Sequence, residues 1–483
     1  MSKWTVMLYL AGDNALGSEC IWSLKEIIRA GLAEGINVVA QFDGRATGVP
    51  IRRYDIRESL EAQMIGQPLL ESDSDGILHD NAEDLKSRRR RGKRHDKDEK
   101  FEEGMAFATT LKEFIIFAVK KRPARHYMLI LSGHGGASEG DVLIKDENPV
   151  RFLSIRRLRF AVEDAIERLK KSKIEKKPNK IDIIGMDACA MSTVEVGFEL
   201  RNVARFMVAA EGFEPNTGWP YHRIFEVLND RKNITPEELS KEIVRKYVNY
   251  YFDYAPAGIS VDLAACKLSL VSNLRNEIMN LGNLLSSALR ESRVVAEDTF
   301  VEKALVENAI ILAHWRAQSY RFEDYVDLWD FCDLLRKSLD GHEKIKEACQ
   351  KVQDAVDDCV MKSCYSGDTF QHSHGLSIHL PWMGIISNRY SDLTFSRRRS
   401  WVGFLVKYLN QTRRRHRNDS GQSKDKLQNA GLAADAESEI RISDPDDRIS
   451  DPDDRMSDPD DKGKAGRISR VKNPPLGFYR DKC

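Results

Sequence analysis

The chain has 483 residues, 41% of them hydrophobic and 8% aromatic, which is enough apolar material for two or three folded domains. Lys and Arg (75 together) balance Asp and Glu (75 together), so a protein whose whole surface binds nucleic acid or a membrane is disfavoured. The eight cysteines form no CxxC pair, which disfavours a disulfide scaffold and a zinc ribbon. No apolar run approaches the roughly 18 residues of a membrane span.

The chain opens with an apolar run, Trp4–Ala11, that follows Lys3. A signal peptide has a longer apolar core and a cleavage site of small residues. We therefore interpret this run as a buried strand and expect the protein to be cytoplasmic.

Strand-like and helix-like segments alternate over the first two-thirds of the chain. Apolar runs of four to six residues between helices are typical of a mostly parallel sheet covered on both faces, which predicts an α/β fold. The expected strands are Thr5–Leu10, Asn37–Phe42, Tyr127–Leu131, Ile181–Ile184 and Phe206–Ala210, and the expected helices are Ser18–Ala33, Phe107–Lys120, 154–171 and a segment ending at Leu200.

After about residue 265 the pattern becomes mainly helical. We expect helices over 267–291, 300–315, 324–338, 342–363 and 400–409. One strand-like run, Leu376–Leu380, is stopped by Pro381 and could return to the main sheet. The predicted organisation is a catalytic-type α/β domain over 1–265, a smaller mainly helical part over 266–410, and a tail over 411–483.

Two segments are too polar to form a core. A charged insertion spans 86–104 and begins with the basic run Lys86–Arg94, whereas the tail carries three heptads of the type ISDPDDR over 442–462. Each heptad has one apolar residue and a proline, so we predict a disordered acidic tail. The basic run permits binding of a polyanion, but a solvated loop is the commoner use, so a nucleic-acid partner is disfavoured. The repeats lack the glycine turn and final glutamate of a calcium loop.

Reactive residues follow two of the expected strands. Tyr127–Leu131 leads into His134, which is flanked by glycines, and Ile181–Ile184 leads into Asp187 and Cys189. Sites in open α/β sheets form beyond the carboxyl ends of the strands. If these two strands are neighbours, the imidazole and the thiol face one crevice.

A thiol beside an imidazole can act as a nucleophile. His134 would take the proton of Cys189 or stabilise its thiolate, and the start of the following helix would lower the thiol pKa further. The N–H groups of Gly135 and Cys189 could stabilise an oxyanion. These parts suit acyl transfer. The alternative is an ordinary turn and a small buried cysteine, and for Asp187 a carboxylate that caps the next helix.

At these residues the sequence resembles the clostripain family of cysteine peptidases, which are relatives of caspases, legumains and gingipains. His379 departs from the pattern, because relatives tend to have an aromatic residue there. The matching stretches are WTVMLYLAGDN (4–14), LILSGHGG (129–136), GMDACAMSTVEVGFEL (185–200), VAAEGFEPNTGWPY (208–221), YVDLWDF (325–331) and GLSIHLPW (375–382).

The resemblance implies a caspase-like three-layer α/β/α sandwich with a smaller helical part after it. It implies a cysteine endopeptidase in which His134 and Cys189 form the dyad and the backbone of Gly135 and Cys189 holds the oxyanion. It also implies cleavage after Arg or Lys, with Asp187 in the S1 pocket binding the basic side chain. No cofactor or metal ligand is expected, although some relatives need calcium. A catalytically inactive relative that serves as a binding or scaffolding protein is the alternative.

Many members of the family cleave themselves between the dyad histidine and cysteine. In this chain the interval contains the basic segment Arg168–Lys180 and also Lys145, so we expect maturation at one of these places. The insertion at 86–100 is a second candidate, and a solvated linker that is never cut is the alternative. Glu211 and Glu214 follow the strand Phe206–Ala210 and are expected to line a loop, with added negative potential for a basic substrate as the alternative. Asp13 and Asn14 are expected to be turn and cap residues.

Overall fold

The centre of the protein is a mixed eight-stranded β-sheet. The structure is a computed structural model that describes residues 2–44, 51–58, 99–137, 145–147, 150–231, 233–289, 297–320 and 323–412. The strand order is β12-β9-β8-β7-β4-β1-β2-β3, and the strands from β2 to β8 run parallel to one another. Their bounds are β1 (Trp4–Gly12), β2 (Ile36–Gly44), β3 (Arg52–Asp55), β4 (His126–Ser132), β7 (Ile181–Asp187), β8 (Ala204–Ala209), β9 (Val261–Lys267) and β12 (Val360–Ser366).

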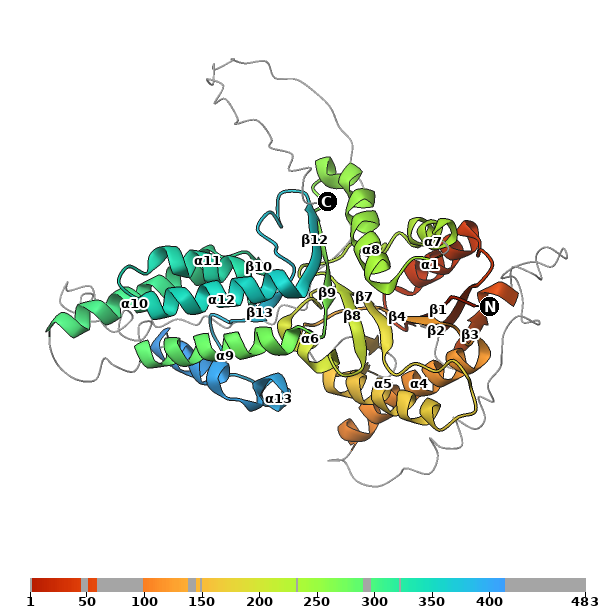
Figure 1. Cartoon of the computed structure of the whole chain (residues 1–483), viewed down its shortest axis with the longest axis horizontal. Coiled ribbons are helices and arrows are strands. Elements are labelled where there is room, and N and C mark those ends of the chain that lie inside the picture. Colours follow the sequence, from red (N-terminus) through yellow and green to blue (C-terminus); the bar gives the residue numbers. More distant parts are fainter. Residues whose placement is uncertain are drawn as a thin grey trace, which may run out of the picture. The chain divides into compact units, whose positions relative to one another are not determined.

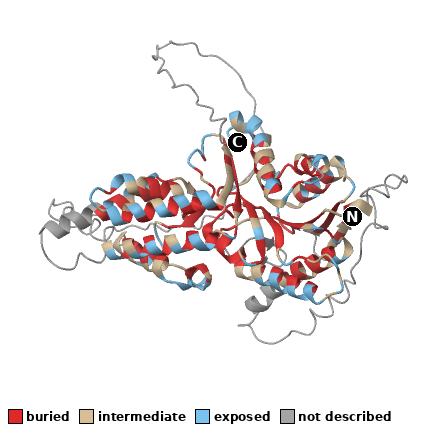
Figure 2. Cartoon of the chain, viewed as in Figure 1, coloured by how far each residue is buried: buried red, intermediate tan, exposed pale blue. Residues whose placement is uncertain are grey.

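Helices cover both faces of this sheet, which confirms the expected three-layer α/β/α arrangement (Figure 1). Successive residues of β1 point to opposite faces. Tyr9 packs with the cluster that includes Phe114 of α4, whereas Leu8 packs with the cluster that includes Leu24 of α1. One face carries α4 (Glu99–Lys121), α5 (Ile155–Lys170) and α6 (Val194–Leu200), and the other carries α1 (Gly17–Ala30), α7 (Tyr221–Asp230) and α8 (Pro236–Tyr251). The burial pattern follows this layering, with red strands enclosed by helices that are exposed on their outer sides (Figure 2).

The part after β9 is mainly helical, as expected, but its strands are placed differently. The run at 376–380 forms β13 (Ser377–His379), which pairs with β11 (Tyr325–Asp327) in a small sheet completed by β10 (Ser319–Tyr320). The expectation that this run could return to the main sheet is therefore wrong. The helices are α9 (Val271–Ala288), α10 (Glu297–Arg316), α11 (Leu328–Ser338), α12 (Glu343–Cys359) and one over 400–412.

The strand that does return to the main sheet is β12. Helix α12 ends at Cys359, and β12 then pairs antiparallel with β9 at the edge of the sheet. The predicted helix over 342–363 is therefore too long at its C-terminal end. Pairing with the edge of the sheet, and not the local apolar pattern, sets the conformation of residues 360–363. Strand β9 also spans the boundary expected at residue 265. The division into 1–265 and 266–410 stays a prediction, and the tail and most of the insertion lie outside the described residues.

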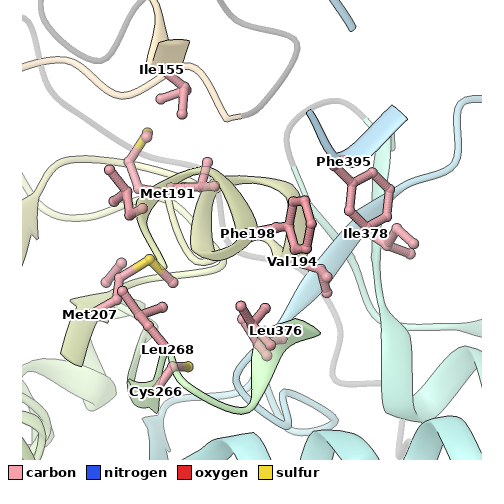
Figure 3. Close-up of a cluster of buried hydrophobic side chains, with 14 of the residues drawn as sticks. Ile155, Met191, Val194, Phe198, Met207, Cys266, Leu268, Leu376, Ile378 and Phe395 are labelled. Carbon is pink, nitrogen blue, oxygen red and sulfur yellow. The ribbon is translucent and has the colours of Figure 1, made fainter. Parts of the chain in front are cut away.

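A buried apolar cluster joins the two parts beneath α6 (Figure 3). Val194 and Phe198 of α6 lie beside Leu376, Ile378 and Phe395 from the C-terminal part. The cluster therefore anchors the helix that follows Cys189. Within the residues described, no helix has the length and apolar character needed to cross a membrane.

Candidate active site

The two strands that precede His134 and Cys189 are neighbours. Strand β4 pairs in parallel with β7, and Ser132 at the end of β4 lies opposite Asp187 at the end of β7. His134 and Cys189 each follow by two residues, so they leave the sheet at the same edge. Both line one pocket, which is partly open to solvent.

The backbone after β4 lies directly against Cys189. A Cβ atom on Gly135 would overlap the carbonyl oxygen of Cys189 and lie 2.7 Å from its nitrogen. Real Cβ atoms do not approach other atoms so closely, so only glycine fits at position 135. The backbones of Gly135 and Cys189 therefore lie directly against each other beside the pocket that His134 and Cys189 line.

Cys189 lies in a turn and not at the start of a helix. Helix α6 begins at Val194, and Thr193 caps it by accepting a hydrogen bond from Val196 N. The expectation that this helix lowers the thiol pKa is wrong, because the helix begins too far along the chain. Burial instead raises the pKa of Cys189, although the backbone N–H of Glu214, which donates to Sγ at 3.3 Å, opposes that rise.

Asp187 is buried beneath the pocket and is only 5% exposed. Its carboxylate accepts hydrogen bonds from Trp219 N at 3.0 Å and from the Tyr221 hydroxyl at 2.7 Å. It does not cap α6, whose cap is Thr193, so the helix-cap alternative for Asp187 is wrong. Burial raises the pKa of Asp187, and the hydrogen bond from Tyr221 partly offsets that rise.

Two further carboxylates line the same pocket, Glu214 and Glu19. Burial and the negative charge of Asp187 raise the pKa of Glu214 well above its usual range. Glu214, expected on a loop, is thus a pocket residue, whereas Glu19 is not marked by any motif in the sequence. The available signal for Glu19 was its position just after β1, whose end lies at the same sheet edge as the ends of β4 and β7.

Two other residues considered from the sequence, Glu211 and Asn14, are not among the residues that line the pocket. Glu211 is fully buried and accepts a hydrogen bond from Gly375 N at 2.7 Å. Asn14 Oδ1 accepts from Leu16 N at 2.8 Å, as expected of a turn residue. No group of three or more His, Cys, Asp or Glu side chains in the described part of the chain has the arrangement of a metal site.

A model of the clostripain family matches residues 8–406. Clostripain of Hathewaya histolytica is 21% identical over 411 residues, which cover 78% of this chain and 74% of that protein.

Two solved structures have a similar fold. One is a secreted C11 cysteine protease of Bacteroides thetaiotaomicron in complex with an irreversible peptide inhibitor (16% identity, TM-score 0.54, covering 83% of this chain and 100% of that one). The other is an inactive zymogen C11 protease of Parabacteroides distasonis (17% identity, TM-score 0.51, covering 82% and 98%).

Proposed function

The chain belongs to the clostripain family and is a cysteine peptidase, and we propose that it hydrolyses peptide bonds after Arg or Lys through a dyad of His134 and Cys189. The observation that carries this proposal is the single pocket that both residues line together with the buried Asp187. An acyl-transfer site needs a nucleophile, a proton acceptor and an anion-stabilising backbone within reach of one scissile bond.

Cys189 attacks the scissile carbonyl carbon through Sγ, and His134 removes the thiol proton. Burial of the thiol favours its neutral form, so the imidazole acts at the moment of attack and does not merely accompany a preformed thiolate. His134 then donates the proton to the leaving amine. Water releases the acyl group from the sulfur and regenerates the thiol.

The oxyanion of the tetrahedral intermediate is held by the N–H groups of Gly135 and Cys189. Their backbones are in direct contact, so the two donors are fixed before substrate binds. Asp187 binds the guanidinium or ammonium of the P1 residue. A carboxylate in a buried wall pairs well with a substrate cation that enters the same low-dielectric pocket.

The test compares the wild type with Cys189→Ala on an Arg-ended fluorogenic peptide. Cys20 offers a matched control, because it lines the same pocket but burial raises its thiol pKa to about 12. We expect Cys189→Ala to abolish cleavage and Cys20→Ala to retain most of it. Iodoacetamide should alkylate residue 189 and not residue 20. Equal activity of Cys189→Ala and wild type would contradict the proposal.

We also propose that the protein cleaves itself, at Lys145. The alternative segment, 168–180, is tied to the core: the Tyr127 hydroxyl donates to Lys176 O at 2.6 Å, and Lys180 Nζ donates to Arg201 O at 2.7 Å. A protease needs an extended, detachable segment, and this one would have to break these bonds first. Lys145 instead begins the short hairpin of β5 (Lys145–Glu147) and β6 (Val150–Phe152).

Denaturing gels and intact mass of the wild type and Cys189→Ala test self-cleavage. We expect two fragments of the wild type that meet at Lys145, and an uncut variant. A cut within 168–180 or in the 86–100 insertion would overturn the assignment of the position. Two uncut proteins would overturn self-cleavage itself.

A further inference from the structure

One wall of the pocket comes from helix α1, which the proposed mechanism does not use. Leu16, Glu19, Cys20 and Ser23 lie there. Glu19 is half-buried, and its Oε2 atom is buried without a hydrogen-bond partner in the described structure. A buried carboxylate oxygen without a donor costs free energy unless a ligand supplies one.

The other carboxylates of the pocket differ in what they can still accept. Both oxygens of Asp187 already accept hydrogen bonds, one from Trp219 N and one from the Tyr221 hydroxyl. Glu214 receives the indole N–H of Trp219 on Oε1 at 3.4 Å, whereas its Oε2 has no partner among the described residues. Two glutamates that each have one carboxylate oxygen without a partner, Glu19 from α1 and Glu214 from the loop after β8, therefore line one pocket.

Of the residues that line the pocket, His134 alone can carry a positive charge. None of the residues that line it is Lys or Arg. Burial raises the pKa of both Asp187 and Glu214, and the negative charge of Asp187 adds to the rise at Glu214, so the pocket disfavours several charged carboxylates at once. A cation brought by the substrate would relieve both the repulsion and the missing hydrogen bonds.

The distribution of acceptors distinguishes the two basic side chains. A guanidinium presents five N–H donors on separate edges of a plane, whereas an ammonium is a compact point charge with three donors. Acceptors supplied from α1, from the end of β7 and from the loop after β8 suit a ligand that donates in several directions. A single carboxylate would suffice for an ammonium.

We propose that Glu19 is a specificity-determining residue, which accepts a hydrogen bond from the P1 guanidinium and makes the enzyme prefer Arg to Lys. The inference rests on the proposed cleavage after basic residues. It adds a residue from α1 to the pocket and a direction to the preference.

Glu19 also lies in the first turn of α1, where a negative charge stabilises a helix. Two variants separate this role from substrate binding. Glu19→Asp keeps the charge in the first turn but shortens the reach into the pocket. Glu34→Gln removes one negative charge from an exposed residue just beyond the same helix, so it controls for a change in net charge.

The experiment measures kcat/KM of the full-length protein and the three variants on two fluorogenic peptides that differ only in P1 Arg or Lys. A lost hydrogen bond to a charged group corresponds to about a ten- to hundredfold loss. We expect that loss on the Arg peptide for Glu19→Gln and Glu19→Asp, a loss below about threefold on the Lys peptide, and no change for Glu34→Gln. The rate of alkylation of Cys189 should stay at the wild-type value.

Equal losses on the two peptides, or no loss in Glu19→Gln, would overturn the role of Glu19 while leaving cleavage after basic residues intact. Full Arg activity in Glu19→Asp with a loss in Glu19→Gln would assign the effect to charge in the helix turn and would also overturn the proposal. If the wild type cleaves neither peptide, the proposed function itself fails, and the inference fails with it.

Discussion

Replacing Asp187 with Asn tests the P1 assignment while keeping the shape of the side chain. If Asp187 pairs with the P1 guanidinium as proposed, the variant leaves a substrate cation without its partner in a buried wall. Breaking one side of a buried ion pair costs about 3–5 kcal/mol. At about 1.4 kcal/mol per tenfold, kcat/KM on an Arg peptide should fall by about two to three and a half orders of magnitude.

Asp187→Asn also disturbs the hydrogen bonds that hold Asp187 in place, so a loss of activity needs a control that separates this structural effect from the loss of charge. Asn can still accept one of the two hydrogen bonds that Trp219 N and the Tyr221 hydroxyl donate, so one donor loses its partner, at about 1–3 kcal/mol of folding stability. Tyr221→Phe removes one of these donors and keeps the carboxylate. It is therefore the matched control for a structural effect.

The assay is kcat/KM at pH 8 for wild type, Asp187→Asn and Tyr221→Phe, together with the rate at which iodoacetamide labels Cys189. We expect a large loss only in Asp187→Asn, with labelling preserved in all three. Because burial raises the pKa of Asp187, the wild-type kcat/KM should also decline on the acid side at a higher pH than an ordinary carboxyl group would produce. A loss below threefold in Asp187→Asn, or an equal loss in Tyr221→Phe, would refute the assignment.

Two further predictions concern the contact between Gly135 and Cys189 and the ion pair of His374 in the C-terminal part. Gly135→Ala should lower kcat at least about a hundredfold, because its Cβ would overlap the Cys189 carbonyl oxygen and displace an oxyanion donor; a kcat within tenfold of wild type would contradict this. Burial disfavours a charged His374, but its hydrogen bond to Asp327 and the charges of Asp327 and Asp330 outweigh burial and raise its pKa. A raised histidine pKa stabilises the fold below the unfolded value of about 6.5, and this contribution is lost as pH rises through the folded value. In a Cys189→Ala background, which prevents self-digestion, chemical unfolding should therefore show a smaller loss of stability between pH 6 and 8 for His374→Gln than for the parent, and an identical loss would reject the pairing.

The strands that carry the site could be predicted because their signal is local. Tyr127–Leu131 and Ile181–Ile184 are apolar runs that end in glycine, and parallel strands buried on both faces have this pattern. The candidate site residues could be predicted because they directly follow the carboxyl ends of these strands. The meeting of His134 and Cys189 in one pocket then requires only that the two strands be neighbours.

What the sequence did not reveal depends on contacts between distant segments. The sequence of β12 resembles the end of a helix, and its strand conformation depends on pairing with β9, which lies far away in the chain. Glu19 reads as an ordinary first-turn residue until β1 places α1 beside the pocket. The pKa of Cys189 is raised, and not lowered as its place in the sequence indicates, for the same reason. The burial that raises it comes from several distant parts of the chain, whereas the local sequence predicts only that a helix follows.

The segment that follows Cys189 is held in place on two sides, and one of these is the C-terminal part of the chain. The segment after Cys189 leaves β7 with Ala190 in a left-handed conformation (φ 57°), which a non-glycine residue keeps only when its surroundings impose it. Ala190 N donates to Gly212 O at 2.8 Å, and Ser192 N donates to Ala210 O at 2.7 Å.

The other side of this segment is held by the C-terminal part. The Ser192 hydroxyl donates to Gly375 O at 2.7 Å, and its carbonyl accepts from Ser377 N at 3.0 Å. Gly375 N in turn donates to the buried Glu211, beside Gly212. The strained segment that follows Cys189, the proposed nucleophile, is thus held between the loop after β8 and the strand β13, so residues far from the main sheet fix the position of Cys189.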